Sequence, residues 1–296
     1  MIQLLLDELS ALILRHHEAA ESWGALPRLH VSCSEQPALS YSQVCEPMFA
    51  LVAQGSSAVM LGQRRIGCSA GQYLVVPVDL PLTAYVTQAD SHRPFLGVGF
   101  RLDPAAIAAL ILESDPAAPA ASHVPPGLAV SPLSQDLIEP LIRLLKLADR
   151  PRDIPILGPA IERELLWRLM TGEQGAIVRQ IGLADGRFTQ LSRVIRWIRS
   201  NFDRKLRIAE LAGIAGMSVT SFHRHFLRVT SLTPLQFQKQ IRLQEARTRL
   251  SSGALSAEEV CYSVGYSSPS QFSREYRRLF GRPPGVDRRS HGIGAI

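Results

Sequence analysis

The chain has 296 residues, of which 46% are hydrophobic and 20% charged, and its mean hydropathy is +0.06. This length accommodates two domains with separate cores, and no apolar run reaches the ~18 residues of a transmembrane helix. The net charge of +6 is unevenly distributed. Residues 187–296 contain 19 Lys and Arg against 7 Asp and Glu, a net charge of +12, which leaves −6 on residues 1–186. We therefore expect a C-terminal domain that meets a polyanion and an N-terminal domain with another role.

The beginning of the chain and its cysteines indicate the compartment. Residues 1–17 are apolar but lack the basic region of a signal peptide, and they suit an amphipathic helix packed on a domain. Cys33, Cys45, Cys68 and Cys261 show no CxxC or Cys/His spacing. Such scattered cysteines predict reduced thiols and a cytoplasmic protein.

Residues from about 37 to 101 are expected to form strands. Short apolar or alternating runs are separated there by Gly, Pro, Asp or Ser about every ten residues: MFALVAQG, SAVMLG, RRIGC, QYLVVPV, TAYVTQ and FLGVGF. This pattern is typical of an antiparallel barrel or sandwich. A loop rich in Ala and Pro should follow from Asp115 to Pro126, and then helices over Pro132–Ala148 and about Ile156–Met170.

Two segments near the C-terminus, Leu211–Pro234 and Val260–Pro284, repeat each other. The matched pairs are Ala212 with Cys261 and Gly216 with Gly265 at an offset of 49, then Phe222 with Phe272, Arg224 with Arg274, Phe226 with Tyr276 and Pro234 with Pro284 at an offset of 50. A one-residue slip confined to the turn indicates a repeated supersecondary structure, here a helix-turn-helix. In this interpretation Cys261 is a small packed residue.

Capping signals delimit the helices of this region. Ser218, Thr233, Ser256 and Ser268 are the expected starts, and Gln236 and Glu259 would complete two capping boxes. The helix from Pro234 to about Leu250 would span roughly 25 Å at 1.5 Å per residue. With its flanking turns it could separate the second helices of the two units by about one turn of B-DNA, ~34 Å.

The second helix of each unit should bury its aromatic residues and present polar residues outward. The expected outer residues are Thr220, Ser221, His223, Arg224 and Arg228 in the first unit, and Ser270, Gln271, Arg274, Arg277 and Arg278 in the second. Arg can read guanine and Gln can read adenine in a major groove, whereas outer arginines more often bind phosphate. For Arg224 and Arg274 two interpretations stay open: contact with a base, or contact with phosphate or support of the helix. His223 is either a base reader or an ordinary surface residue. Phosphate contact is favoured for Arg228, Arg277 and Arg278.

At these residues the chain resembles the AraC/XylS family of bacterial transcription regulators, because VGYSSPSQFSREYRRLFG is similar to the family's signature. Residues 45–86 followed by RLDPAAIAALI resemble the N-terminal domain of one branch. The resemblance implies an α+β fold. Residues 1–186 would form a cupin-like antiparallel β-barrel with flanking helices, including a helical linker region at about 130–180. Residues 187–296 would form an all-α domain of two helix-turn-helix units joined by a long helix.

The resemblance also implies a function. It indicates a sequence-specific DNA-binding transcription regulator, in the first interpretation an activator, which reads two successive major grooves and is modulated by a small molecule bound to the N-terminal domain. A repressor or an effector-independent regulator stays open as the alternative. Double-stranded DNA and RNA polymerase are the implied partners, a small-molecule effector and a homodimer stay open, and no membrane partner or cofactor is expected.

An enzymatic N-terminal domain is disfavoured. Enzymatic cupins hold a metal with an HxH motif, a further His and a Glu, but His92 is the only histidine between Gly62 and Gly99. We therefore expect no metal site and no catalytic residue, and Cys33, Cys45 and Cys68 lack the four-cysteine zinc spacing of alkyl-group repair proteins. Tyr73, Tyr85 and His92 could orient a ligand, although core or surface packing is the favoured interpretation.

The chain departs from the family's pattern in two places. Ser231 stands where a glycine usually ends the second helix of the first unit, so we expect that helix end to be capped differently. After Pro284 the usual tyrosine-containing helix is replaced by GVDRRSHGIGAI, so a last helix there should be short or frayed.

Overall fold

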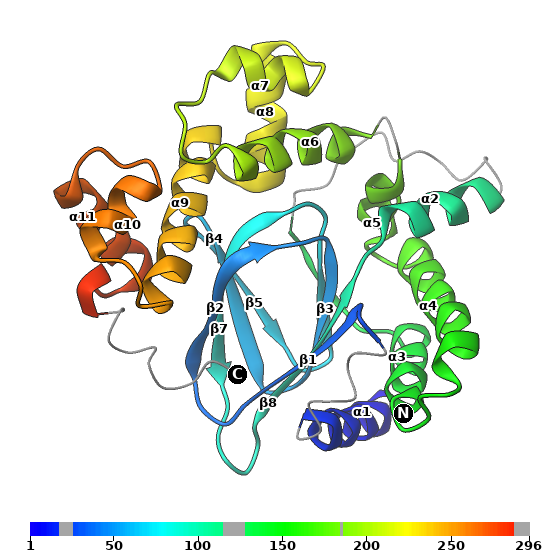
Figure 1. Ribbon diagram of the computed structural model, residues 1–296. Helices are drawn as coiled ribbons and strands as arrows, with labels where there is room; N and C mark the ends of the chain where they lie inside the picture. The colour runs from blue at the N-terminus through cyan, green and yellow to red at the C-terminus, as the bar shows by residue number, and fades with distance from the viewer. Residues whose placement is uncertain (18–25, 115–127, 184–185, 287–296) are drawn as a thin grey trace.

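The computed structural model describes residues 1–17, 26–114, 128–183 and 186–286. Figure 1 shows a central β-structure with one group of helices on its right and two further helical groups above it and on its left. The predicted loop Asp115–Pro126 and the tail after residue 286 lie outside the described residues.

The β-structure consists of two antiparallel sheets. Their strands follow the orders β1-β8-β3-β6-β9 and β2-β7-β4-β5. In chain order the strands are β1 (Leu29–Ser34), β2 (Ala38–Cys45), β3 (Met48–Gln54), β4 (Ser56–Leu61), β5 (Arg64–Ser69), β6 (Gln72–Val76), β7 (Leu80–Gln88), β8 (Phe95–Arg101) and β9 (Val130–Pro132). The runs predicted as strands are confirmed as β3 to β8. β2 lies within the predicted range but is not one of the predicted runs, and β1 and the three-residue β9 lie outside that range.

Alternation along the strands forms the interior of the barrel. Phe49 and Leu51 are two residues apart on β3, so they share a face, and both are buried at 0% and 2% exposure. The rings of Phe49 and Tyr73 lie 5.3 Å apart inside this core. Gly62 and Gly71 close the turns after β4 and β5 with φ of +63° and +78°, a conformation that glycine adopts at little cost.

A layer of helices covers one side of the barrel. It consists of α1 (Ile2–His17), α2 (Pro104–Glu113), α3 (Gln135–Leu147), α4 (Ile154–Thr171) and α5 (Gly175–Gly182). The predicted helices correspond to α1, α3 and α4. Residue patterns alone do not indicate α2 or α5. Asp103 caps α2 by accepting a hydrogen bond from the backbone N of Ala105 at 2.9 Å, and α5 is a short helix between glycines.

The regular elements described in the C-terminal region are all helices. Its helices are α6 (Arg187–Ser200), α7 (Ile208–Ile214), α8 (Val219–Thr230), α9 (Pro234–Ser251), α10 (Ala257–Ser263) and α11 (Pro269–Phe280). The predicted caps are confirmed at Ser218, and both capping boxes form, Thr233 with Gln236 and Ser256 with Glu259. We call α7 and α8 the first unit, and α10 and α11 the second unit.

Ser231 ends α8 in the left-handed conformation that a glycine would adopt there. Its φ is +54°, and its backbone N–H donates to the carbonyl of Leu227 at 2.8 Å. It is the one non-glycine residue with positive φ among the described residues. The expectation of a different cap was therefore wrong, since the chain keeps the backbone geometry and places a serine in it.

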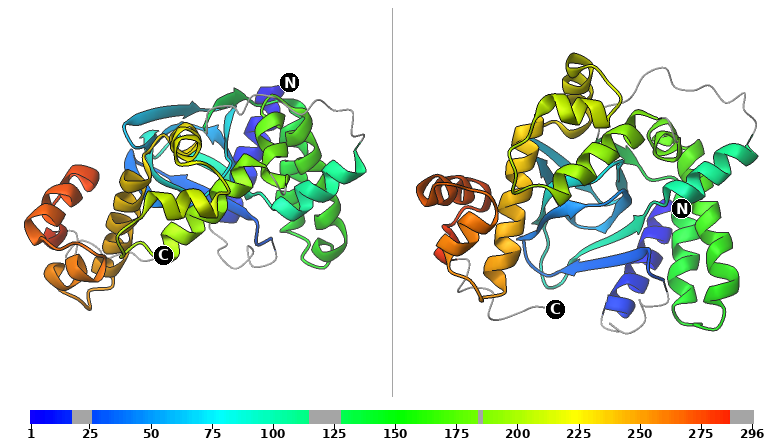
Figure 2. Two further views of the ribbon diagram at one scale, coloured as in Figure 1. Left: turned by 90° about the horizontal axis from the view of Figure 1, so that it is seen from above. Right: turned by 45° about the horizontal axis from the view of Figure 1, so that its top comes forward.

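The barrel and the C-terminal region contact each other along α9. This helix packs on β2 and β7, where the Gln244 side chain donates to the Leu82 carbonyl at 3.4 Å. Arg199 on α6 forms an ion pair with Asp79 at 2.5 Å. One apolar core runs from the barrel through α5 and α6 into the first unit, whereas the second unit has a separate core. Figure 2 shows the second unit on the far side of α9 from the barrel.

Candidate nucleic-acid interface

The first unit has the small residues that a helix-turn-helix requires at the crossing of its helices and in its turn. Ala212 on α7 is 2% exposed, which lets α8 approach closely. Gly216 adopts a φ of +64° in the turn, where a side chain would be strained. The Ser218 hydroxyl then accepts from the backbone N of Ser221 at 3.3 Å and starts α8.

Helix α8 separates into a buried aromatic face and an open polar face. Phe222 and Phe226 are completely buried, and the ring of Phe226 packs edge-on against Phe237 of α9 at 5.4 Å. The predicted outer residues lie on the other side: Thr220, His223 and Arg224 are exposed, and Ser221 and Arg228 are half-buried. The aromatic face thus anchors α8 to α9 and leaves its polar face to solvent.

The second unit repeats this arrangement with one more residue in its turn. Cys261 is fully buried at the helix crossing, in agreement with its interpretation as a packed residue, and burial raises the pKa of its thiol. Gly265 adopts a φ of +85°. The turn runs from residue 264 to 268 instead of 215 to 218, which is where the sequence places the one-residue slip.

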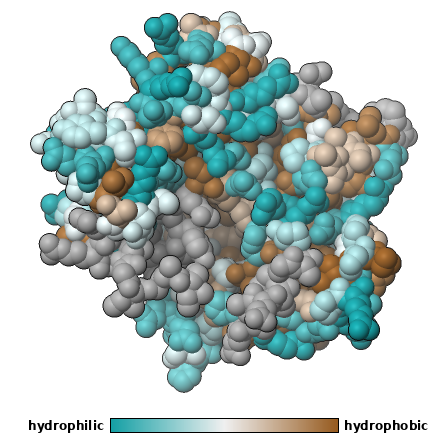
Figure 3. Space-filling model, viewed as in Figure 1, coloured by the Kyte–Doolittle hydropathy of each residue, from teal (hydrophilic) through white to brown (hydrophobic). Residues whose placement is uncertain are grey.

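Helix α11 buries Phe272 and Tyr276, whose rings lie 5.6 Å apart. Of the predicted outer residues, Ser270, Arg274, Arg277 and Arg278 are exposed and Gln271 is half-buried. Within the described part of the chain, neither Arg224 nor Arg274 has an ion-pair partner, so both guanidinium groups are available to an external anion. Figure 3 shows hydrophilic residues over both units on the face viewed there.

A carboxylate on the buried side of α11 limits which contacts Gln271 can make. Glu275 is 9% exposed and accepts hydrogen bonds from Lys239 at 2.7 Å, from Tyr266 at 2.8 Å and from Gln271 at 3.1 Å. Burial alone would raise the pKa of Glu275, but these three donors hold that pKa below its usual value. The Gln271 amide donates to Glu275, so bidentate reading of adenine would require this contact to break.

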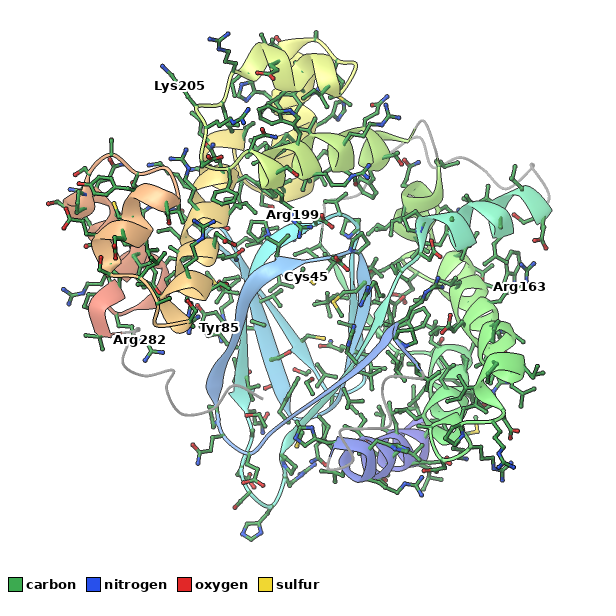
Figure 4. The ribbon with its side chains drawn as sticks, viewed as in Figure 1. Cys45, Tyr85, Arg163, Arg199, Lys205 and Arg282 are labelled. Atoms are coloured by element: carbon green, nitrogen blue, oxygen red, sulfur yellow. The ribbon has the colours of Figure 1, made fainter. Side chains whose placement is uncertain are left out.

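Several residues on the same surface were missed from the sequence. Leu227 is 49% exposed and Ser273 is exposed, and both extend the outer faces of α8 and α11. The repeat offset of 50 could have found them, because it pairs His223 with Ser273 and Leu227 with Arg277. The turn before α7 adds exposed cations at Arg204, Lys205 and Arg207, and Figure 4 shows Lys205 projecting from the edge of the molecule.

The three residues considered for a ligand in the barrel do not lie together. Tyr73 is 1% exposed, and burial raises its pKa while its hydroxyl bonds to Ser131 and to the backbone of Gln174. Tyr85 is half-buried on β7, on the opposite strand face from the core residues Leu82 and Val86.

His92 is exposed in the loop after β7, where its backbone N donates to Asp90 at 2.9 Å. Among the residues that the structure describes, no group of three or more His, Cys, Asp or Glu is arranged to hold a metal ion. The structure also contains, within those residues, no helix of the length and apolarity needed to cross a membrane.

The fold and this surface define a class of protein: a β-barrel domain joined to a domain of two helix-turn-helix units. Comparison with known families agrees. The description "AraC-type transcriptional regulator N-terminus" matches residues 25–177, and "Helix-turn-helix domain" matches residues 211–290. The chain belongs to the AraC family of transcription regulators, a family of DNA-binding proteins and not of enzymes.

The curated relatives match only part of their length. The transcriptional regulator GlxA of Rhizobium meliloti is 32% identical over 130 residues, 43% of this chain and 40% of that protein. The transcriptional activator NphR of Rhodococcus is 35% identical over 106 residues, 36% of this chain and 31% of that protein. The virulence activator VirF of Yersinia enterocolitica is 27% identical over 159 residues. The chain thus spans about a third to just over half the length of these relatives.

Solved structures share the fold over most of the chain. ToxT from Vibrio cholerae O395 superposes with a TM-score of 0.54 at 11% identity, and the match covers 91% of this chain and all of ToxT. A ToxT structure with a bound unsaturated fatty acid gives a TM-score of 0.56 at 11% identity, covering 90% and 97% of the two chains. These likenesses support the α+β architecture, with a β-barrel domain followed by helices.

Proposed function

We propose that this protein binds double-stranded DNA sequence-specifically and reads two successive major grooves with α8 and α11. The observation that carries the proposal is the pair of recognition helices with equivalent open polar faces, both mounted on α9. That helix has 18 residues and is therefore about 27 Å long. With its flanking turns it suits the ~34 Å between successive major grooves on one face of B-DNA.

The charge of the C-terminal region supports DNA binding at the same surface. Residues 187–296 carry a net charge of +12, and cations on the open faces of both units suit phosphates as well as bases. The two units differ in their outer residues, with His223 and Arg224 on one and Ser273 and Arg274 on the other. We therefore expect an asymmetric pair of groove segments as the target of one chain.

Regulation is proposed to pass from the barrel to α9. Arg199 with Asp79 and Gln244 with Leu82 connect the two parts, so a small molecule bound to the N-terminal domain could shift the position of α9. NphR and VirF are named activators, which favours an activator that works with RNA polymerase in the cytoplasm. A repressor or an effector-independent regulator is the alternative, and an unchanged affinity for DNA across candidate effectors would support the latter.

A second copy of the chain is proposed to bind at α2 and α4. A groove of about 400 Å³ between these helices includes Trp167, which is 40% exposed. Ile156 is 76% exposed on the same helix, and Figure 3 shows apolar residues on this side of the molecule. Antiparallel pairing of two α4 helices would bring the exposed Arg150 and Arg152 beside Glu173 of the other copy. Sedimentation should then show a dimer that Trp167→Asp dissociates, and a monomeric wild-type protein would contradict this.

The test of DNA binding starts from a site selected out of random duplexes. The affinity for that site should fall steeply with salt, because each phosphate contact releases counterions. A Kd nearly flat between low and physiological salt would overturn the proposal.

Arginine variants then separate reading from positioning. If Arg224 or Arg274 reads a base, its replacement by Ala should weaken binding to the selected site by ~1–3 kcal/mol and weaken binding to unrelated DNA much less. An equal loss on all sequences would make the residue a phosphate contact. Arg65→Ala is the matched control, since it removes an exposed cation from β5 of the barrel.

A further inference from the structure

The turn that precedes the first unit meets the turn inside the second unit, and both meet at one arginine of α9. Arg242 donates from Nε to the carbonyl of Phe202 at 2.6 Å and from Nη1 to the carbonyl of Gly265 at 2.7 Å. Its Nη2 donates to the carbonyls of Asp203 at 3.1 Å and Arg204 at 3.2 Å. A single guanidinium thus binds the turn between α6 and α7 and the turn between α10 and α11.

A neighbouring amide reinforces one side of this contact. Gln238 lies one helical turn before Arg242, is 5% exposed, and donates to the carbonyls of Phe202 at 2.8 Å and Arg204 at 2.6 Å. The carbonyls of residues 202–204 lie in the turn beyond α6, which ends at Ser200, and such backbone groups need donors from elsewhere. Gln238 and Arg242 supply them, so residues 202–204 are held against α9. We call Gln238, Arg242, residues 202–204 and Gly265 the clamp.

The backbones of the two turns are themselves in contact. A Cβ added to Gly265 would lie 2.4 Å from the carbonyl oxygen of Asp203, closer than real Cβ contacts allow. Gly265 also has a φ of +85°. The glycine therefore serves two purposes, since it shapes the turn of the second unit and leaves room for the turn before the first.

The apolar cores of the two units are separate but share one neighbour. The first unit belongs to the large core that begins in the barrel, and the second unit has its own core around Phe272 and Tyr276. Phe202 is half-buried and packs against both cores. The hydrogen bonds of Arg242 add a directional link between the two turns to this apolar contact, and five donors in a planar fork suit that role better than one ammonium group.

We propose that Arg242 is a positioning residue that sets the distance and helical phase between α8 and α11, and so the spacing of the two DNA half-sites that one chain accepts. The inference rests on the proposed reading of two grooves. It requires no contact between Arg242 and DNA. The clamp would hold the second unit at one angle about α9, and DNA whose half-sites are displaced by a base pair would be rotated out of register.

The test measures the affinity of the purified full-length protein for duplexes that carry both half-sites at spacings varied by single base pairs. The wild-type protein should prefer one spacing. In Arg242→Ala the affinity at that spacing should fall roughly tenfold, in line with the loss of hydrogen bonds from a charged group. Affinity at neighbouring spacings should change little, so the preference flattens, and binding to an isolated half-site should be unchanged.

Two further variants keep the test decisive. Arg204→Ala removes an exposed cation from the same turn while its backbone carbonyl stays, so it should weaken binding equally at every spacing. Arg242→Lys keeps the charge with fewer donors and should flatten the preference partly. If Arg242→Ala fails to fold, the spacing preference of Arg242→Lys decides the test.

The outcomes separate the two proposals. A wild-type protein without any spacing preference, or without binding to paired half-sites, would contradict the proposed two-groove function itself. A wild-type protein with a clear optimum that folded Arg242 variants keep unchanged would overturn the clamp and leave the function intact. A uniform loss at all spacings would make Arg242 a phosphate contact and would also overturn the clamp.

Discussion

Ser231 shows what a single unusual residue indicates about the end of a helix, and what it does not indicate. A side chain in the left-handed region is strained, and the chain accepts that strain to end α8 where Leu232 can pack beside Gly62 of the barrel. The sequence indicates the unusual residue, because a glycine is expected there. It does not disclose the conformation, because serine could equally have ended the helix in an extended cap.

Replacing Ser231 by Gly should stabilise the protein. Glycine adopts a φ of +54° without strain, and this gain should exceed its larger entropy loss on folding, so we expect about 0.5–1 kcal/mol in the free energy of unfolding. Urea denaturation monitored by circular dichroism measures this change in the free energy of unfolding. Ser252→Gly is the matched control, since Ser252 ends α9 with a φ of −69° and should be destabilised by glycine. Equal effects of the two changes would contradict the account of Ser231.

Glu275 shows where residue patterns mislead about polarity. It lies three residues after Phe272, on the buried side of α11, although its charge suggests the surface. Only the structure shows that Lys239 and Tyr266 come from other elements to meet it. Such long-range donors cannot be deduced from spacing along one helix.

At the scale of elements, capped and strongly patterned segments could be predicted. The starts of α8, α9 and α10 follow from Ser218, Thr233 and Ser256, whose side chains accept from the backbone three residues on. In contrast, α5 and β9 have only 8 and 3 residues. Their formation depends on neighbours that are remote in the chain, since β9 exists by pairing with β6 and α5 packs on α2.

The attachment of α11 to α9 should depend on pH. The pKa of Glu275 is lowered in the folded protein, so its contribution to stability is present above the usual value of 4.5 and is lost as the pH falls through the folded pKa. Glu275→Gln should lower the free energy of unfolding by about 1–3 kcal/mol at neutral pH. The difference from the wild-type protein should shrink below about pH 4.5.

Urea titrations at several pH values measure this difference. Glu210→Gln provides a control at an exposed carboxylate of α7, and its effect should be small at every pH. A Glu275→Gln effect that is constant from neutral to acid pH would show that the carboxylate's charge contributes nothing.

At the scale of the whole molecule, the two predicted domains share an apolar core and an ion pair. The repeat predicts the two helix-turn-helix units well, because it is a local property of the sequence. The packing of α9 on β2 and β7 could not be predicted, since no periodicity relates Gln244 to Leu82 or Arg199 to Asp79. For the same reason the barrel's ligand candidates Tyr73, Tyr85 and His92 could not be placed relative to one another.

The ion pair between Asp79 and Arg199 should couple the barrel to α6. The side chain of Asp79 is 15% exposed and that of Arg199 is 37% exposed. A double-mutant cycle with both residues changed to Ala should give a coupling energy of about 1 kcal/mol in the free energy of unfolding. The pair Glu245–Arg249 within α9 should give less, near 0.3–0.5 kcal/mol. Additive effects at Asp79 and Arg199 would show that the contact does not connect the two parts.

The central claim is that one chain places two different recognition helices in successive major grooves. Hydroxyl-radical footprinting of the purified protein on a selected site tests it most directly. We predict two protected windows on one face of the duplex, about one helical turn or 10–10.5 bp apart. Arg274→Ala should weaken protection in one window and Arg224→Ala in the other. A single window that both variants weaken alike would contradict the claim.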